Sequence, residues 1–480
     1  MREGLDGFEY RYASIEELSD ALRARILSSV ELSAEAIRLL DTIGREFNAV
    51  ANTLGARATA DAEHADAMLA EGSPHSLCGV PYGVKDLFSA SGAPTTWGSP
   101  AFAYQEIESD AEVVSRLGRV GAVLAAKLSL SELAGGGSPR MPGASLHGAG
   151  INPWNHSLYS GGSSSGSAIA VCLGLLPFAL GTETGGSVLW PSAFTGVTGL
   201  RTTKGRVPRA GAMTLSATLD KVGIISRSAK DCAIVLGELA QPWAGTDQIP
   251  TGDGMTVAFD PAEVEEAAPE MREALTLALD QFLSSGCHVV ANTFPRRPEY
   301  ISALKTIIAA EGAFEFRTSL LDPGFEMSDE TQKENLRAGL EVALEDYLIA
   351  RLETTSHASR AFEELFDHAD VILSITRSEP TPLLNEPRRP RDEQKLADIL
   401  AAAGNLAGVP GLTMPAGLGS DGSPVGIQVI GPRGADETLL SIGQEFQSRT
   451  GYHELRPDQD GSAARDESGT SPNNGRPLSQ

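Results

Sequence analysis

Apolar residues recur at every third or fourth position through residues 14–69, the spacing typical of one face of an amphipathic helix. Ser14 stands three residues before Glu17, which is the spacing of a capping box at a helix N-terminus. Ser33 precedes a second acidic turn. The sequence therefore predicts two or three helices over this segment.

Further along the chain, short apolar runs alternate with longer amphipathic stretches. Short runs bounded by glycine and polar residues are typical of buried strands. The predicted strands are residues 78–84, 120–127, 176–181, 256–260, 288–292 and 370–375, and the predicted helices include residues 168–175, 262–285, 341–368 and a segment that begins at Val188. This alternation predicts an α/β fold in which a central mixed, twisted β-sheet is covered on both sides by α-helices.

Glycine and serine gather in two turns on either side of the predicted helix and strand at residues 168–181. Residues 161–167 read GGSSSGS, and residues 181–187 read GTETGGS. A third motif, GVPYGVKD at residues 79–86, ends the first predicted strand and contains a lysine. A Gly-Ser cluster alone is typical of a flexible linker, but two such turns together with the upstream lysine favour a catalytic site.

These residue types suit acyl transfer. A serine hydroxyl is a poor nucleophile until a base takes its proton, and neighbouring glycines let backbone N–H groups converge on an oxyanion. A lysine can be that base if burial lowers its pKa from ~10.4 toward ~7–8. Lys85 lies in an apolar run that can provide this burial, and Asp86 is expected to point to the opposite face of the strand. A Ser-His-Asp triad is disfavoured, because Ser187 lies in no GxSxG elbow and the eight histidines occupy no obvious partner motif. Neither turn has the lysine of a phosphate-binding loop.

The three motifs resemble those of the amidase signature family, whose members cleave amides and related acyl compounds with a Ser-Ser-Lys triad. Further matches are GVTGLRTTKGRV at residues 196–207 and NLAGVPGLTMP at residues 405–415. The resemblance implies that Lys85 is the base, that Ser163, in a cis peptide, is the relay, and that Ser187 is the nucleophile.

The resemblance also implies where an oxyanion and a substrate would bind. The expected oxyanion donors are the backbone N–H groups of Thr184, Gly185, Gly186 and Ser187. In the family, a binding channel is formed in part where this chain has very small residues. The implied substrate-binding residues are Leu133, Ala134, Gly135 and Gly136. We expect a roomy pocket there, able to accept bulky acyl or leaving groups.

Two positions depart from the family pattern beside the nucleophile turn. Many relatives carry aspartate where this chain has Glu183 and arginine where it has Leu189, a pair expected to form a charge contact. Because a buried carboxylate without a partner is costly, Glu183 must find another partner or reach solvent. Lys127 is expected to cap or pair locally, and Arg201 is expected on the surface or bracing a loop, as is Lys204.

Composition restricts the class of protein. The chain has 480 residues, of which 41% are hydrophobic and 21% charged, as is typical of globular proteins. A net charge of −25 disfavours nucleic-acid binding, and no apolar run reaches the roughly 18 residues of a membrane span. The four cysteines form no zinc or disulfide pattern, which predicts buried free thiols and fits a reducing cytoplasm. They are Cys78, Cys172, Cys232 and Cys287.

The predicted organisation is a single domain over residues 1–455, with a variable substrate-specificity region at about 250–395, followed by a polar, disordered tail at 456–480. The predicted function is hydrolysis of amide C–N bonds without a metal or organic cofactor, with aryl carbamates (urethanes) and esters as additional substrates. The alternatives are a glutaminase subunit of a tRNA-dependent amidotransferase and an inactive binding scaffold. The oligomeric state stays open, with a homodimer among the possibilities.

Overall fold

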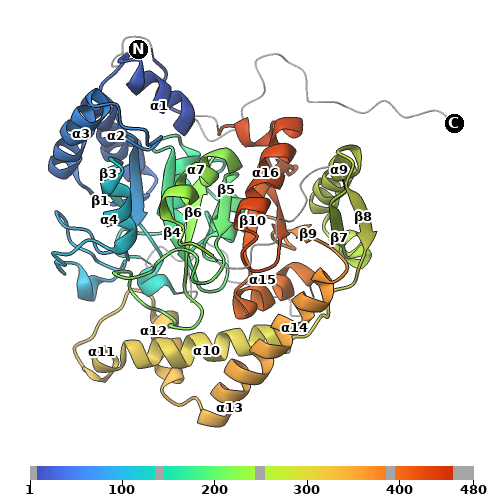
Figure 1. Ribbon diagram of the computed structural model, residues 1–480. Coiled ribbons are helices and arrows are strands. Elements are labelled where there is room, and N and C mark those ends of the chain that lie inside the picture. The colour runs from blue at the N-terminus through green and yellow to red at the C-terminus, as the bar shows by residue number, and fades with distance from the viewer. Residues whose placement is uncertain (1–7, 136–144, 244–253, 385–394, 458–480) are drawn as a thin grey trace.

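The computed structural model describes residues 8–135, 145–243, 254–384 and 395–457 (Figure 1). Within these residues eleven strands form one sheet, in the order β1-β3-β2-β4-β6-β5-β10-β11-β9-β7-β8. The strands are β1 (Val50–Thr53), β2 (Pro81–Lys85), β3 (Val123–Leu128), β4 (Phe178–Glu183), β5 (Thr198–Arg201), β6 (Lys221–Ser226), β7 (Thr256–Phe259), β8 (His288–Ala291), β9 (Val371–Ile375), β10 (Gly411–Leu418) and β11 (Pro424–Ile430).

The sheet is mixed, as predicted. β3, β2 and β4 are parallel neighbours, and so are β9, β7 and β8, whereas the strands between β4 and β9 in the sheet order pair antiparallel. β2 and β4 therefore end at the same edge of the sheet. This brings the segment after Lys85 next to the turn that follows Glu183.

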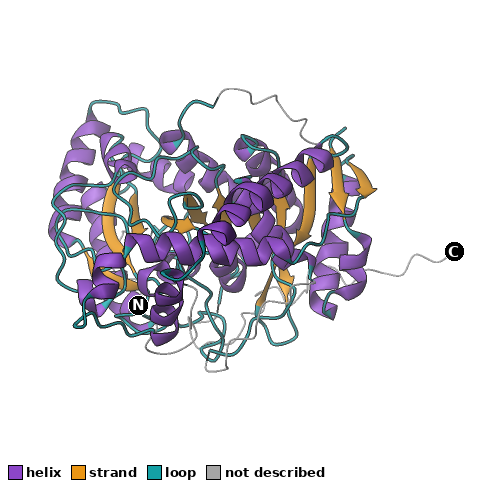
Figure 2. Ribbon diagram, turned by 90° about the horizontal axis from the view of Figure 1, so that it is seen from below, coloured by secondary structure: helices purple, strands orange, loops and turns teal. Residues whose placement is uncertain are grey.

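Helices cover both faces of this sheet (Figures 1 and 2). α4, α7, α16 and α9 form one layer, and α5 and α6 pack on the strands from the other side. The α-helices are α1 (Ile15–Arg23), α2 (Ser29–Leu39), α3 (Gly55–Ala70), α4 (Glu112–Arg119), α5 (Ser165–Cys172), α6 (Leu189–Thr195), α7 (Ala229–Leu239), α8 (Pro261–Glu266), α9 (Pro269–Ser284), α10 (Glu299–Glu315), α11 (Arg317–Leu321), α12 (Glu330–Gly339), α13 (Leu344–Leu348), α14 (Thr355–Phe366), α15 (Leu396–Ala407) and α16 (Asp436–Thr450).

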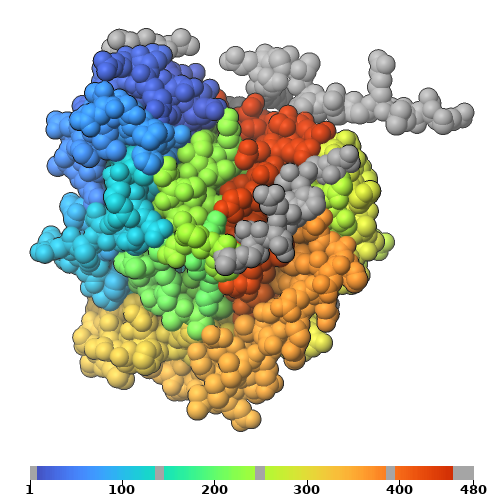
Figure 3. Space-filling view, viewed as in Figure 1, coloured from blue at the N-terminus to red at the C-terminus, as the bar shows by residue number. Residues whose placement is uncertain are grey.

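A group of helices, α10 to α14, covers one edge of the sheet. In Figure 1, α10 runs across the lower edge with α12 beside it and α13 below, and in the space-filling view of Figure 3 this group forms the lower part of the molecule. α10 also packs on α15. This group lies within the predicted substrate-specificity region at about residues 250–395.

The N-terminal helices agree with the sequence pattern except at one cap. Ser14 and Glu17 form the predicted capping box at the start of α1. The second box is formed by Ser28 and Glu31, whereas Ser33 is buried inside α2, so the prediction of a helix start at Ser33 was wrong. Ser28 and Glu31 have the same spacing as the first pair, and the pattern therefore contained the right signal.

Two predicted helices are subdivided. The helix predicted at 262–285 is α8 and α9, because Pro269 has no backbone N–H to continue a helix and instead begins a new one. The helix predicted at 341–368 consists of α13, a π-helical segment at Ile349–Thr354 and α14. The predicted tail lies outside the described residues from residue 458 onward.

The chain's cysteines are four free, buried thiols, as predicted. In the part of the chain that the structure describes, no helix combines the length and the apolar character needed to cross a membrane.

The start of α5 gives a test of this fold. A Cβ at Gly166 would lie 2.3 Å from the carbonyl oxygen of Ala49 and 2.5 Å from the nitrogen of Ser129. Backbone atoms cannot move aside cheaply, so Gly166→Ala should lower the free energy of unfolding by at least about 2–3 kcal/mol in urea denaturation. Gly237→Ala in α7 is the control. A Cβ there meets nothing within 4 Å, and its effect should be neutral or stabilising by up to about 1 kcal/mol. Equal effects of the two substitutions would contradict the packing of α5.

Candidate active site

Lys85 and Ser163 meet in the interior of the protein. Lys85 ends β2, Ser163 lies in the turn before α5, and their Nζ and Oγ atoms are 2.7 Å apart. Lys85 is fully buried and Ser163 is 2% exposed. The Gly162–Ser163 peptide bond is cis, as the family resemblance predicts. Two residues that are distant in sequence are thus in direct contact.

The surroundings of Lys85 favour its neutral form. Burial lowers the pKa of Lys85 to about 7, although the more distant carboxylates of Asp220 and Glu183 act in the opposite direction. Its amine donates to the hydroxyl and the carbonyl of Thr182, at 3.1 and 3.4 Å. A neutral amine has two N–H bonds and one lone pair. The ammonium form donates to Ser163, whereas in the neutral form, with Thr182 accepting both N–H groups, the lone pair is left for the Ser163 hydroxyl.

Asp86 points away from Lys85, as predicted for neighbours on a strand. Its carboxylate pairs with Lys127 of β3, with 2.8 Å between Nζ and Oδ1, and both side chains are fully buried. The backbone N–H and the hydroxyl of Thr96 donate to the second oxygen, at 3.0 and 2.5 Å. Lys127 therefore pairs locally, as predicted, and this pairing keeps the charge of Asp86 away from the Lys85 amine.

The two serine turns touch through their backbones. The N–H of Ser164 donates to the carbonyl of Ser187 at 3.2 Å. Gly161 lies so close to α6 that a Cβ there would be 2.5 Å from the Cα of Pro191. Ser187 is half-buried. Among the hydrogen bonds of the described residues, none joins the side chains of Ser163 and Ser187, so the link between the turns is made by the main chain.

The turn that precedes Ser187 is held from several sides. Thr184 donates its hydroxyl to Asp220 at 2.7 Å. Gly186 has a φ of +115° and lies under the indole of Trp190, where a Cβ would be 2.5 Å from the ring. Gly185 faces α10, and a Cβ there would lie 3.1 Å from Leu304. The predicted oxyanion segment is thus packed between α6 and α10.

Glu183, whose partner the sequence left open, binds four groups. One carboxylate oxygen accepts the N–H groups of Val188 and Leu189, and the other binds Arg201 and Asn405. The surface position considered for Arg201 was therefore wrong, because Arg201 is fully buried and pairs with Glu183 at 3.3 Å. The N–H groups of Val188 and Leu189 are consequently not available to an oxyanion.

The predicted substrate-binding segment is compact. Leu133 and Ala134 are buried, and a Cβ at Gly135 would lie 2.2 Å from the side chain of Gln332 in α12. Glu132 holds α12 here, because its carboxylate accepts the N–H of Asp329 at 2.7 Å. The expected roomy pocket is therefore not formed beside Gly135, where Gln332 fills the space. Gly136 lies outside the described residues.

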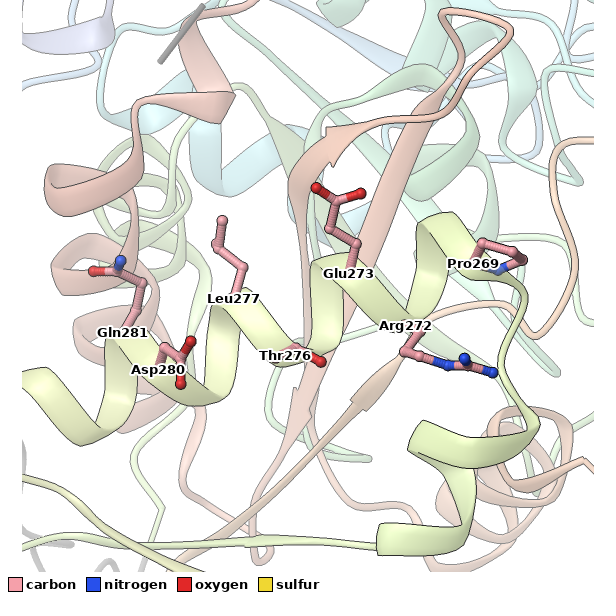
Figure 4. Close-up of a pocket in the computed structure, with 7 residues that line it drawn as sticks. All are labelled: Pro269, Arg272, Glu273, Thr276, Leu277, Asp280 and Gln281. Atoms are coloured by element: carbon pink, nitrogen blue, oxygen red, sulfur yellow. The ribbon is translucent and has the colours of Figure 1, made fainter. Parts of the chain in front are cut away.

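A separate groove of about 520 Å³ runs along α9 (Figure 4). It contains none of the predicted site residues. Its lining consists of Pro269, Arg272, Glu273, Thr276, Leu277, Asp280 and Gln281.

Comparison with known proteins extends this picture. A family model described as Amidase matches residues 31–440. The A subunit of glutamyl-tRNA(Gln) amidotransferase from Chromohalobacter salexigens is 32% identical, over 92% of this chain and 98% of that protein. The protein of the same name from Roseiflexus sp. is 34% identical, over 92% of this chain and 94% of that protein.

Solved structures agree with the family match. A crystal structure of an amidase superposes with a TM-score of 0.80 at 28% identity, over 91% of this chain and all (100%) of that one. The peptide amidase of Stenotrophomonas maltophilia gives a TM-score of 0.78 at 25% identity, over 92% and 97%. The chain is thus an enzyme, a hydrolase that acts on carbon–nitrogen bonds other than peptide bonds. It belongs to the amidase signature family.

The buried pair behind the site gives a second test. Lys127→Met would leave the carboxylate of Asp86 buried without its cation, which typically costs about 3–5 kcal/mol. We expect a loss of this size in the free energy of unfolding, measured by urea denaturation. The double variant Lys127→Met/Asp86→Asn should recover more than half of the loss, because an asparagine oxygen can still accept from Thr96. A double variant no more stable than the single one would contradict the pairing.

Proposed function

We propose that the protein hydrolyses amides through an acyl-enzyme formed on Ser187, with Ser163 as relay and Lys85 as base. The contact of 2.7 Å between a buried, partly deprotonated lysine and the Ser163 hydroxyl is the observation that supports this proposal best. Burial makes the amine a base near neutral pH, and the Ser163 hydroxyl lies closer to it than the Thr182 hydroxyl does, at 2.7 against 3.1 Å.

The proposed reaction has four steps. Neutral Lys85 takes the proton of Ser163, Ser163 takes the proton of Ser187, and the Ser187 oxygen attacks the carbonyl carbon. Backbone N–H groups of residues 184–187 stabilise the oxyanion, each donor contributing about 2.7–4 kcal/mol. When the C–N bond breaks, the proton passes from Ser163 to the leaving amine. Water then attacks the ester, gives up a proton through the same relay and releases the acid and Ser187.

The substrate has two candidate classes. One is an amide that the protein cleaves alone; the charge of −25 and the divergent sequence where the glutaminase subunits bind glutamine favour this class. The other is glutamine, cleaved by a subunit that passes ammonia to a partner of a tRNA-dependent amidotransferase. The names of the curated relatives support the second class better than the first. Carbamates and esters stay predictions from the sequence, without support from the relatives.

We assign substrate selection to the variable region at about residues 250–395. Its helix α10 supports this assignment, because Leu304 and Ile308 lie against Gly185 of the nucleophile turn.

The triad can be tested by substitution. Ser187→Ala and Lys85→Ala should each lower kcat by about 10⁴-fold or more, and Ser163→Ala should lower it severely, because the three groups act as one unit. The assay uses purified protein with an aryl amide, an aliphatic amide, an aryl carbamate, an ester and glutamine. Ser165→Ala, in the same turn, is the matched control and should keep activity within a few-fold. Wild-type turnover by Ser187→Ala would refute the assignment.

The same panel separates the two substrate classes. Turnover of an anilide by the isolated chain supports the free-standing amidase. Glutamine hydrolysis that appears only after addition of the other amidotransferase subunits supports the alternative.

The pH dependence tests Lys85 directly. The protonated amine cannot accept a proton, so kcat/KM should rise with pH and level off, with an apparent pKa of about 7. Burial lowers the pKa of Lys221 on β6 to about 7 as well, but Lys221 donates to the carbonyl of Leu219. Lys221→Gln should therefore keep the ascending limb. Loss of the ascending limb in Lys221→Gln would mean that the limb reports Lys221 and not Lys85.

A further inference from the structure

Glu183 closes the turn that carries Ser187. The residue is the last of β4, and one oxygen of its carboxylate accepts the N–H groups of Val188 and Leu189 at 2.9 and 3.0 Å. These two residues follow Ser187 directly. The carboxylate therefore ties the end of the turn back to its beginning and limits where the Ser187 backbone can lie.

The second oxygen of Glu183 is held by two donors from distant parts of the chain. Arg201 of β5 lies at 3.3 Å and the amide of Asn405 in α15 at 3.0 Å. All three side chains are fully buried. Burial alone would raise the pKa of Glu183, but Arg201 and the hydrogen bonds from Leu189, Asn405 and Val188 outweigh it, and the pKa lies below its ordinary value. The carboxylate is thus ionised in the interior.

The guanidinium of Arg201 lies in a space made by two glycines. A Cβ would lie 2.6 Å from its Nη2 at Gly404 and 3.1 Å from it at Gly411. Its Nε donates to the carbonyl of Val409 at 3.1 Å. The Leu189 side chain lies 3.4 Å from the same Cβ position at Gly411. The charged end of Arg201 is therefore beside the side chain of position 189.

We infer that Arg201 is a positioning residue for the Ser187 turn, acting through Glu183, and that it supplies from β5 the positive charge that position 189 lacks. This inference rests on the proposed role of Ser187. Without the guanidinium, Glu183 would keep its hydrogen bonds to Val188, Leu189 and Asn405 but would lose its ion-pair partner, and it would take up a proton or move toward water. Either change loosens its bonds to Val188 and Leu189. The effect should fall on kcat, since neither Arg201 nor Glu183 contacts the Ser163–Lys85 pair.

The test moves the arginine from position 201 to position 189. Arg201→Leu should lower kcat by about 10²-fold, the size expected when a reacting group moves by about 1 Å, with KM changed by no more than about 3-fold on the substrate that the panel identifies. Arg201→Lys keeps the charge but not the planar guanidinium, and it should lose less. The double variant Arg201→Leu/Leu189→Arg places an arginine next to the vacated site. It should recover at least tenfold of the lost kcat.

Two outcomes would overturn the inference when Arg201→Leu folds. The first is a wild-type kcat in the Arg201→Leu protein. The second is a double variant that is as stable as Arg201→Leu in thermal unfolding but no more active. If Arg201→Leu does not fold, the double variant is compared with Arg201→Lys, and a folded double variant that is less active than Arg201→Lys overturns it. Ser187→Ala separates the two proposals. Its full activity would refute the function itself, whereas an inactive Ser187→Ala together with a fully active Arg201→Leu refutes only the role of Arg201.

Discussion

The contact between the Lys85 amine and the Ser163 hydroxyl depends on burial at one edge of the sheet. Burial removes water from the amine and lowers its pKa to about 7, and Thr182 accepts its two N–H groups. The parallel pairing of β2 with β4 sets this arrangement, because it brings the end of the lysine strand beside Thr182 and the turn that follows. A shift of one residue in that pairing would turn Lys85 to the opposite face of the sheet.

Two buried cations near this contact are each paired with a buried carboxylate. Lys127 has Asp86, and Arg201 has Glu183, each pair fully buried. Lys85 has no carboxylate within ion-pair distance among the described residues, and its pKa falls accordingly. If Asp86 faced Lys85, its charge would raise the pKa of the amine and oppose the effect of burial. The alternation of side chains along β2 and the Lys127 pair on β3 prevent this, so the neighbouring strand contributes to the chemistry without touching the serines.

The strand pattern is a local signal, and it predicted the mixed sheet and β2, β3, β4, β7, β8 and β9, but not the other strands. The two glycine turns and the lysine motif carry the family resemblance, which implied the Lys85–Ser163 contact and the cis peptide. The break at Pro269 and the cap at Ser28 were also readable from local spacing. Arg201 was not, because its role depends on Glu183 and Asn405, which the fold brings together from far apart in the chain. Gln332 filled the expected pocket for the same reason.

The proposed reacting groups and the proposed substrate-selecting residues lie in different parts of the protein. The sheet and its turns hold the proposed reacting groups. α10, from the region to which we assign substrate selection, packs against Gly185 through Leu304 and Ile308. A change on this helix can therefore alter what lies over the nucleophile turn without moving Lys85 or Ser163. If substrate selection lies in this region, as we propose, relatives can share one reaction while differing in substrate.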